Sequence, residues 1–225
     1  MKTVSLTIDG KSVTTREGEN LLWAALDNGI YIPNLCALRD KPEPFAACRL
    51  CFVEVEGKQQ PVTACTETVA DGMVVNTRGE KALRLSRSGF ALLMASLAVD
   101  CAHCVKSGSC ELQKIAHHLG AKLKSKHLRK LQRELPIDDS HPLFTYDPNK
   151  CVLCGRCVWV CQQHLGVGVF GFAHRGFERM VTTFGNEPIG ASRCEECAEC
   201  ISICPTGALV FKDTKKTEVK SKVRG

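Results

Sequence analysis

Fifteen cysteines are the residues of this 225-residue chain best suited to chemistry, and eight of them form two runs of matching spacing. In each run, three cysteines are separated by two residues each and a fourth follows after three more. The runs are Cys151, Cys154, Cys157 and Cys161, then Cys194, Cys197, Cys200 and Cys204, with Pro205 following the last. Three thiolates from one tight loop can bind three irons of a 4Fe–4S cubane, so this spacing indicates iron–sulfur chemistry.

The same spacing occurs in bacterial two-cluster ferredoxins, in which the fourth cysteine of each run binds the other cluster. It predicts two 4Fe–4S clusters with crossed ligands, which would lie close enough for electron transfer. One set is Cys151, Cys154, Cys157 and Cys204, and the other is Cys161, Cys194, Cys197 and Cys200. A zinc protein would be expected to show pairs of CxxC instead of two matched runs of four.

A second group of cysteines lies nearer the amino terminus and consists of Cys36, Cys48, Cys51 and Cys65. Four thiolates without a histidine argue against a Rieske centre and favour a 2Fe–2S cluster. The gap between the first two cysteines is longer than in plant-type ferredoxins and contains two prolines, Pro42 and Pro44, which with Pro33 just before the gap would stiffen the loop. A zinc site on the same four residues is the alternative.

The elements that must position this group are predicted from hydrophobic periodicity. Apolar residues alternate over 4–8, Asp9-Gly10 suits a tight turn, and a return strand follows, which indicates a hairpin. A helix is expected over 19–28, with Gly29 as its stop. Strands are expected over 52–56 and 73–77, so this region should be a small mixed sheet packed on one helix.

Beyond this sheet the pattern becomes helical over 79–99, and a second helix, broken at Gly120, is expected over 112–135. The latter part of that helix would be basic and amphipathic. It is either a solvated face over a small core or a docking face for an acidic partner. Prolines at 136 and 142 predict a linker, and residues 167–181 predict a strand pair inserted between the two cysteine runs.

The composition sets limits on the class of protein. No amino-terminal segment combines basic residues with an apolar run, and no stretch approaches the roughly 20 apolar residues that span a bilayer. We therefore expect a cytoplasmic protein, in which disulfides are disfavoured and so many thiols require metal. The aromatic content of 6% is low for a base-stacking surface, so nucleic-acid binding is not expected.

Several of these motifs together carry a resemblance to known proteins over nearly the whole chain. The chain resembles the amino-terminal region of the large iron–sulfur subunit of respiratory complex I and the ferredoxin-like diaphorase subunit of NAD-reducing nickel–iron hydrogenases. It is also similar to the accessory domains of multi-cluster iron-only hydrogenases. The matching segments are 31–36, 47–51, 100–104, 109–113 and both cysteine runs.

The resemblance implies a third 4Fe–4S cluster on Cys101, Cys104 and Cys110. The family adds a histidine four residues before the first of these cysteines, and this chain has Leu97 there. The fourth ligand is therefore left open between an iron exposed to solvent and a nearby side chain. The candidate side chains are Asp100, His103, His117 and His118.

These groups predict an α+β chain of three domains and a tail. Residues 1–78 should form a β-grasp 2Fe–2S ferredoxin domain, 79–140 a small helical 4Fe–4S domain, and 141–212 a two-cluster 4Fe–4S ferredoxin domain, followed by a charged tail at 213–225. The formal net charge of +6 would fall to about −1 once four anionic clusters are bound. We read the basic residues as compensation for the clusters.

The expected function is electron relay between a flavin-bearing NAD(P)H-oxidising subunit and a separate catalytic subunit of the hydrogenase or formate dehydrogenase type. All 15 cysteines are used by the four clusters, and no GxGxxG nucleotide motif follows a strand, so no catalytic centre is expected in the chain itself. One alternative is a relay subunit of an electron-bifurcating or other reductase. The other is a scaffold in which the clusters only hold the fold.

Overall fold

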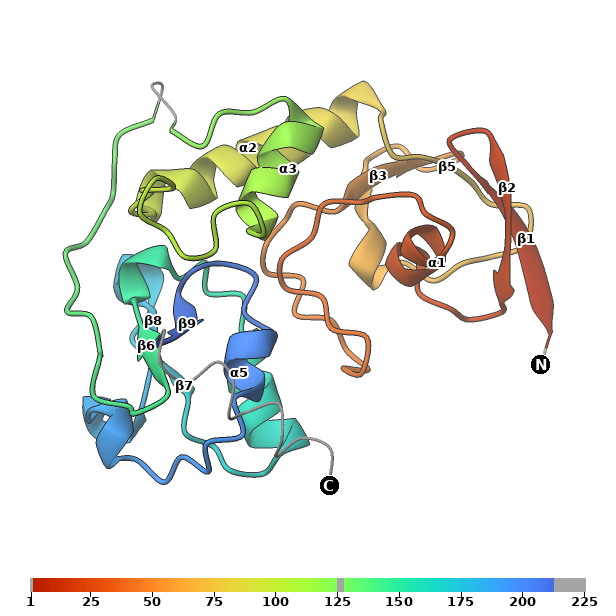
Figure 1. The fold of residues 1–225 in the computed structure, drawn as a ribbon. Helices are drawn as coiled ribbons and strands as arrows, with labels where there is room; N and C mark the ends of the chain where they lie inside the picture. The colour runs from red at the N-terminus through yellow and green to blue at the C-terminus, as the bar shows by residue number, and fades with distance from the viewer. Residues whose placement is uncertain (1, 125–127, 213–225) are drawn as a thin grey trace. The chain divides into compact units, whose positions relative to one another are not determined.

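The computed structural model describes residues 2–124 and 128–212, which divide into two compact units (Figure 1). Met1–Leu93 with Ile115–Leu128 make up the first unit, and Met94–Lys114 with Arg129–Gly225 make up the second. The three domain ranges expected from the sequence stay a prediction. The charged tail expected at 213–225 lies outside the described residues.

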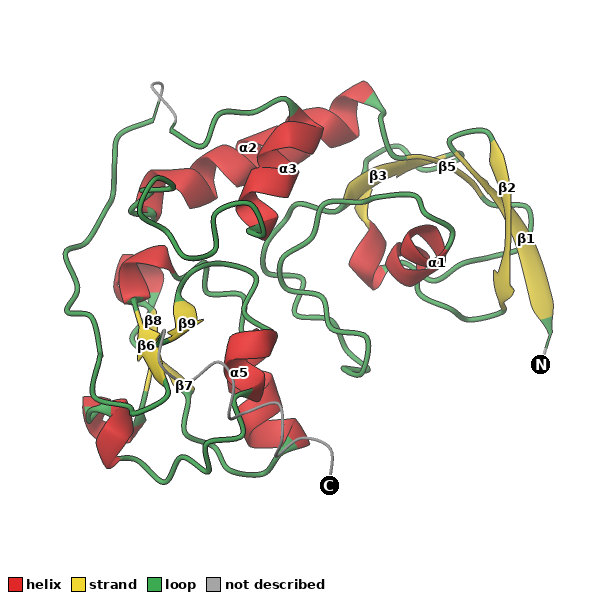
Figure 2. Cartoon of the chain, viewed as in Figure 1, coloured by secondary structure: helices red, strands yellow, loops and turns green. Residues whose placement is uncertain are grey.

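The first unit contains a five-stranded sheet in the order β2-β1-β5-β3-β4 (Figure 2). Its strands are β1 Thr3–Ile8, β2 Lys11–Arg16, β3 Phe52–Val55, β4 Val62–Thr63 and β5 Val74–Asn76. β1 and β2 form the expected antiparallel hairpin, and β1 pairs in parallel with β5. Hairpin, helix and parallel return strand together make the predicted β-grasp fold.

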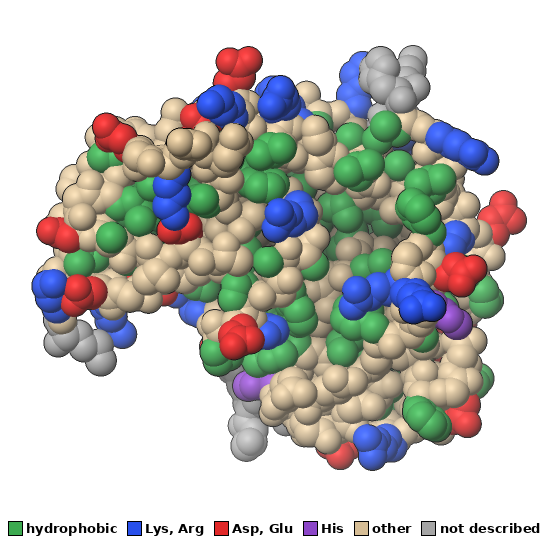
Figure 3. All heavy atoms as spheres, turned by 180° about the vertical axis from the view of Figure 1, so that it is seen from behind, with side chains coloured by type: hydrophobic (Ala, Val, Ile, Leu, Met, Phe, Trp, Pro, Cys, Tyr) green, Lys and Arg blue, Asp and Glu red, His purple; other side chains and the backbone are tan. Residues whose placement is uncertain are grey.

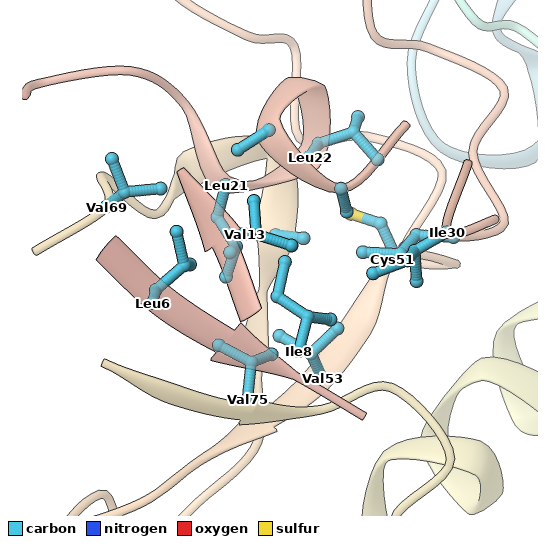
Figure 4. Packing of buried hydrophobic residues seen from close by; sticks show 14 of the residues in the cluster. Leu6, Ile8, Val13, Leu21, Leu22, Ile30, Cys51, Val53, Val69 and Val75 are labelled. Carbon is cyan, nitrogen blue, oxygen red and sulfur yellow. The ribbon is translucent and has the colours of Figure 1, made fainter. Parts of the chain in front are cut away.

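The helix α1 (Leu21–Asp27) lies over this sheet and buries one face against it. The Asn20 side chain caps its amino end by accepting a hydrogen bond from the Leu22 N–H at 3.1 Å. Leu21 and Leu22 are fully buried with the alternate β1 residues, so removal of apolar surface from water stabilises the unit. Figure 4 shows Cys51 beside Ile30 within this core.

Two longer helices follow, α2 (Glu80–Ser96) and α3 (Glu111–Leu119). Within the first unit, the Ser86 hydroxyl donates to the Leu50 carbonyl at 2.8 Å, and the Arg87 Nε donates to the Leu119 carbonyl at 2.8 Å. These bonds attach α2 to the loop of the first cysteine group and to the end of α3.

The second helical piece predicted after Gly120 is wrong, because the described residues from 121 to 135 contain no helix. Their backbone groups bond to other segments instead: the Leu131 N–H donates to the Ala95 carbonyl at 2.8 Å. The Asn149 side chain accepts from the Leu135 N–H and donates to the Leu135 carbonyl. Leu128 and Leu131 are exposed, so the amphipathic helical face does not form in this part of the chain.

The second unit holds two small antiparallel sheets. β6 (Phe144–Tyr146) pairs with β9 (Leu209–Phe211), and β7 (Gly171–Ala173) pairs with β8 (Met180–Thr182). The second pair confirms the strand pair predicted between the cysteine runs. The short helices are α4 Arg156–Trp159 and α5 Glu199–Ser202, with a π-turn η3 at Val160–His164. Single 3₁₀ turns are η1 Ala64–Thr66, η2 Pro148–Lys150, η4 Gly176–Glu178, η5 Phe184–Asn186 and η6 Ile189–Ala191.

Candidate iron–sulfur sites

The first site lies in the β-grasp unit, where Cys36, Cys48, Cys51 and Cys65 are all buried. The thiols form two hydrogen-bonded pairs, Cys36 with Cys48 and Cys51 with Cys65. Within each pair the shared proton raises the pKa of one thiol and lowers that of the other, so the pKa of Cys48 falls to about 6 while that of Cys36 rises. Two pairs of thiols suit a centre with two irons.

Backbone contacts hold these cysteines in place. The Asn20 Nδ2 donates to the Cys65 carbonyl at 2.7 Å, which couples the start of α1 to the site. The Ala64 N–H donates to the Cys51 carbonyl at 2.8 Å. Ala46 and Arg49 adopt left-handed backbone conformations, with φ of 49° and 56°, where the loop turns around Cys48. A left-handed residue other than glycine costs about 1–2 kcal/mol, so the loop is curved against its local preference.

The two cysteine runs of the second unit fold into matching loops. Leu153 and Gly155 have φ of 53° and 78° in the first run, and Glu196 and Ala198 have φ of 57° and 62° at the same positions of the second. The backbone of each loop thus adopts a left-handed conformation twice before the chain enters α4 or α5. Three of these four residues carry side chains, so the repeated strain is consistent with loops shaped to surround a cluster.

Electrostatic interactions among the thiols show which cysteines lie together. Burial raises the pKa of Cys157 well above its ordinary value, and the neighbours that raise it further include Cys154, Cys151 and Cys204. Burial also raises the pKa of Cys200, with added contributions from Cys197, Cys194 and Cys161. Cys200 also acts on Cys157, and Cys204 also acts on Cys200, but in both cases the larger contributions come from the two cysteines of the same run and then from the fourth cysteine of the other run. This order is the one that the predicted crossed ligation would produce.

Cys161 reaches the other run because it sits in the π-turn that follows α4. Its sulfur accepts a hydrogen bond from the Val169 N–H at 3.1 Å. π-turns are frequent at functional sites, but the sequence pattern gave no sign of this one.

The middle group, Cys101, Cys104 and Cys110, is half-buried. Burial raises the pKa of Cys110, and the neighbouring Cys104 and Cys101 thiols raise it too. The backbone N–H groups of Leu112 and Gln113, at the start of α3, point at the Cys110 sulfur and act in the opposite direction. The three thiols thus lie together near the amino end of α3.

The loop after Cys204 approaches this middle group closely. A β-carbon on Gly207 would lie 2.8 Å from the Cys104 sulfur, a distance that only glycine allows. The Pro205 carbonyl accepts from the Glu111 N–H at 3.1 Å, and the Cys204 thiol donates to the Thr206 carbonyl at 3.4 Å. Residues 204–207 thus connect the middle cysteines to Cys204, which belongs to the thiol set that also contains Cys151, Cys154 and Cys157.

The four side chains that could replace the missing histidine ligand lie in different environments. Asp100 and His103 are exposed and bond to each other, Oδ2 to Nδ1, at 2.7 Å. His117 lies seven residues beyond Cys110, a rise of about 10 Å along α3. His118 packs edge-on against Tyr31, and burial lowers its pKa. Leu97 itself is buried.

A single metal ion needs three or more ligands around one point. Among the residues that the structure describes, no three Cys, His, Asp or Glu side chains converge in this way.

These folds and thiol sets define an iron–sulfur protein of the ferredoxin class, with 2Fe–2S and 4Fe–4S binding regions. A 2Fe–2S iron–sulfur cluster binding domain matches residues 1–80, the iron–sulfur binding region of NADH-ubiquinone oxidoreductase-G matches 89–123, and the ferredoxin-like domain of NADH-quinone oxidoreductase subunit 3 matches 141–210. The chain belongs to the family of iron–sulfur proteins that includes the gamma subunit of the NAD-reducing hydrogenase HoxS of Cupriavidus necator. It is 32% identical to that subunit over 93% of this chain and 87% of the relative.

A solved structure supports the same family assignment. The chain superposes on one chain of a crystal structure of NAD⁺-reducing [NiFe]-hydrogenase in the H₂-reduced state with a TM-score of 0.83 and 31% identity. The match covers 95% of this chain and 89% of that one.

Other relatives are much longer than this chain. It is 39% identical to the alpha subunit of the NADPH-Fe(3+) oxidoreductase of Geobacter sulfurreducens, but it covers only 24% of that subunit. It is 34% identical to the HndD subunit of the NADP-reducing hydrogenase of Solidesulfovibrio fructosivorans and covers 36% of it. The chain therefore spans about a quarter to a third of these two relatives.

Two surface properties bear on the predicted partners. None of the described helices is both long and apolar enough to cross a membrane. On the face drawn in Figure 3, the described Lys and Arg side chains lie in small separate groups among Asp and Glu, without a continuous basic stripe.

Proposed function

We propose that the chain relays electrons through one 2Fe–2S and three 4Fe–4S clusters. The 2Fe–2S cluster is assigned to Cys36, Cys48, Cys51 and Cys65. The 4Fe–4S clusters are assigned to Cys101, Cys104 and Cys110, to Cys151, Cys154, Cys157 and Cys204, and to Cys161, Cys194, Cys197 and Cys200. When bound, the clusters supply one-electron chemistry; the chain's own residues fix their positions and exclude water.

The observation that carries this proposal is the contact of residues 204–207 with the middle cysteines. The Cys104 sulfur lies 2.8 Å from the position that a β-carbon on Gly207 would take, and Cys204, three residues before Gly207, belongs to the next thiol set. The crossed sets extend this series within the second unit to Cys161, Cys194, Cys197 and Cys200. Thiol sets that adjoin in this way suit stepwise electron transfer, whereas a scaffold would not need them to adjoin.

The proposed partners are based on the relatives, which include hydrogenase subunits that act with NAD or NADP and an NADH-quinone oxidoreductase subunit. We propose a flavin-bearing NAD(P)H-oxidising subunit on one side and a hydrogenase- or formate-dehydrogenase-type catalytic subunit on the other, in the cytoplasm. A relay in an electron-bifurcating or other reductase is the second candidate, and the match to an Fe(3+) oxidoreductase subunit supports it.

Purification of the tagged chain from its source under anaerobic conditions tests the placement. Mass spectrometry of the co-purifying chains should find a flavoprotein and a catalytic subunit, whose identity separates the two candidates. A chain that purifies without any flavoprotein, at a salt concentration that preserves other complexes, would contradict the proposal.

A further inference from the structure

Lys150 lies where the middle cysteines meet residues 204–207. It is the last residue of η2 and directly precedes Cys151. Its ammonium pairs with Asp147, Nζ to Oδ2, at 2.9 Å, and 31% of its side chain is exposed, against 11% for Asp147. The Thr206 hydroxyl donates to the Lys150 carbonyl at 3.0 Å, which fixes the backbone of Lys150 against the loop.

The Lys150 side chain shares a neighbour with Cys104. The Cys104 sulfur and the Lys150 Cδ lie 2.8 Å and 3.7 Å from the position that a β-carbon on Gly207 would take. Both atoms therefore border the same small space beside Gly207.

The charge of Lys150 acts on the middle group specifically. Its ammonium interacts electrostatically with Cys104 and Asp100 as well as with Asp147. The cations that act on the neighbouring thiol set are different: Arg133 on Cys151 and Arg156 on Cys154. Lys150 therefore differs from the two arginines whose charges act on the cysteines of the first run.

We propose that Lys150 is a positioning residue that raises the reduction potential of the cluster on Cys101, Cys104 and Cys110. This inference rests on the proposed function. Reduction adds one negative charge to the cluster, and a fixed positive charge nearby stabilises that state, more strongly in a partly buried site than in water. Asp147 holds the ammonium in place and offsets part of its field, so the two residues act with opposite signs.

The test is a potentiometric titration of the iron-loaded full chain followed by electron paramagnetic resonance. The signal of the middle cluster is identified as the one altered in Cys104→Ser. Lys150→Gln should reduce the equilibrium constant for one-electron reduction of that cluster three- to tenfold, where tenfold is 59 mV. Lys150→Arg keeps the charge and should leave the potential near that of the unmodified chain.

Two further variants separate charge from structural damage. Asp147→Asn should shift the same potential upward, because it removes a negative charge, whereas a loosened fold would shift both variants in the same direction. Arg133→Gln should move the Cys151 cluster and leave the middle cluster unchanged. An unchanged middle potential in Lys150→Gln, or equal shifts in all clusters, would overturn the inference. Clusters of the unmodified chain that cannot be reduced reversibly would instead overturn the proposed function.

Discussion

The Cys104 sulfur lies 2.8 Å from the point where a β-carbon on Gly207 would stand. This contact joins the middle cysteines to the loop that begins at Cys204. At Gly207 only glycine fits, so a substitution of this residue tests whether the middle cysteines depend on the loop that begins at Cys204.

Gly207→Ala should displace either Cys104 or the loop, because the added methyl group cannot be accommodated at that distance. Overpacking of this kind costs about 1–3 kcal/mol. We expect a lower thermal midpoint and a weaker signal from the middle cluster in iron-loaded protein. Gly171→Ala is the matched control, since its methyl group would meet only the Gln162 amide at 3.7 Å. Equal loss in the two variants would show that Gly207 has no special role.

Crossed ligation predicts which cysteine substitutions share a phenotype. Cys204→Ser should alter the same resonance signal as Cys151→Ser, because their thiols lie in one set, and Cys161→Ser should alter the same signal as Cys194→Ser. Spectra of the four variants at matched iron loading provide the measurement. If Cys204→Ser instead matches Cys194→Ser, ligation follows the runs and the assignment fails.

The middle cluster should lose iron first under mild oxidation. Only three cysteines are available to it, and Asp100 and His103 are exposed and bonded to each other. We therefore expect one iron to be solvent-ligated, so that ferricyanide produces a 3Fe–4S signal that Asp100→Asn and His103→Gln leave unchanged. Mössbauer spectra with an ordinary four-coordinate site and a nitrogen ligand would contradict this expectation.

The metal-free chain should lose stability as the pH rises above about 9. Burial raises the pKa of Cys151 to about 11 and that of Cys154 to about 12, from an ordinary 9.0. Above pH 9 the unfolded thiols lose their protons while the folded ones keep them, so the unfolded state binds fewer protons and the free energy of unfolding falls with pH.

Urea denaturation at pH 8 and pH 10, followed by far-ultraviolet circular dichroism, measures this change. A chain carrying Cys151→Ser and Cys154→Ser should show a smaller decrease, because two of the contributing thiols are gone. Stability that rises between the two pH values would refute the argument.

Much of the fold follows from local sequence signals. The alternation around Leu6, the Asp9-Gly10 turn and the stop at Gly29 each act within a few residues, and the hairpin and α1 formed as predicted. The predicted helix beyond Gly120 did not form, because Ala95 and Asn149, distant in sequence, bond to its backbone. Leucine spacing alone cannot reveal such partners.

The candidate sites also combine features that local spacing predicts with features that only the folded chain reveals. The spacing predicts the thiol sets, because CxxCxxC places three sulfurs in one loop, and those ligand assignments stay a prediction. It could not predict the π-turn that carries Cys161 or the closeness of Gly207 and Lys150 to Cys104, since these depend on tertiary contacts between the two ends of the second unit.

Redox titration of the iron-loaded full chain, combined with iron analysis, tests the electron-relay claim most directly. The assignment predicts about 14 iron atoms per chain and four centres that are reduced and reoxidised reversibly, including by a reduced flavoprotein. Clusters that assemble in full but stay oxidised at every potential reached by such a donor would contradict the relay and favour a scaffold.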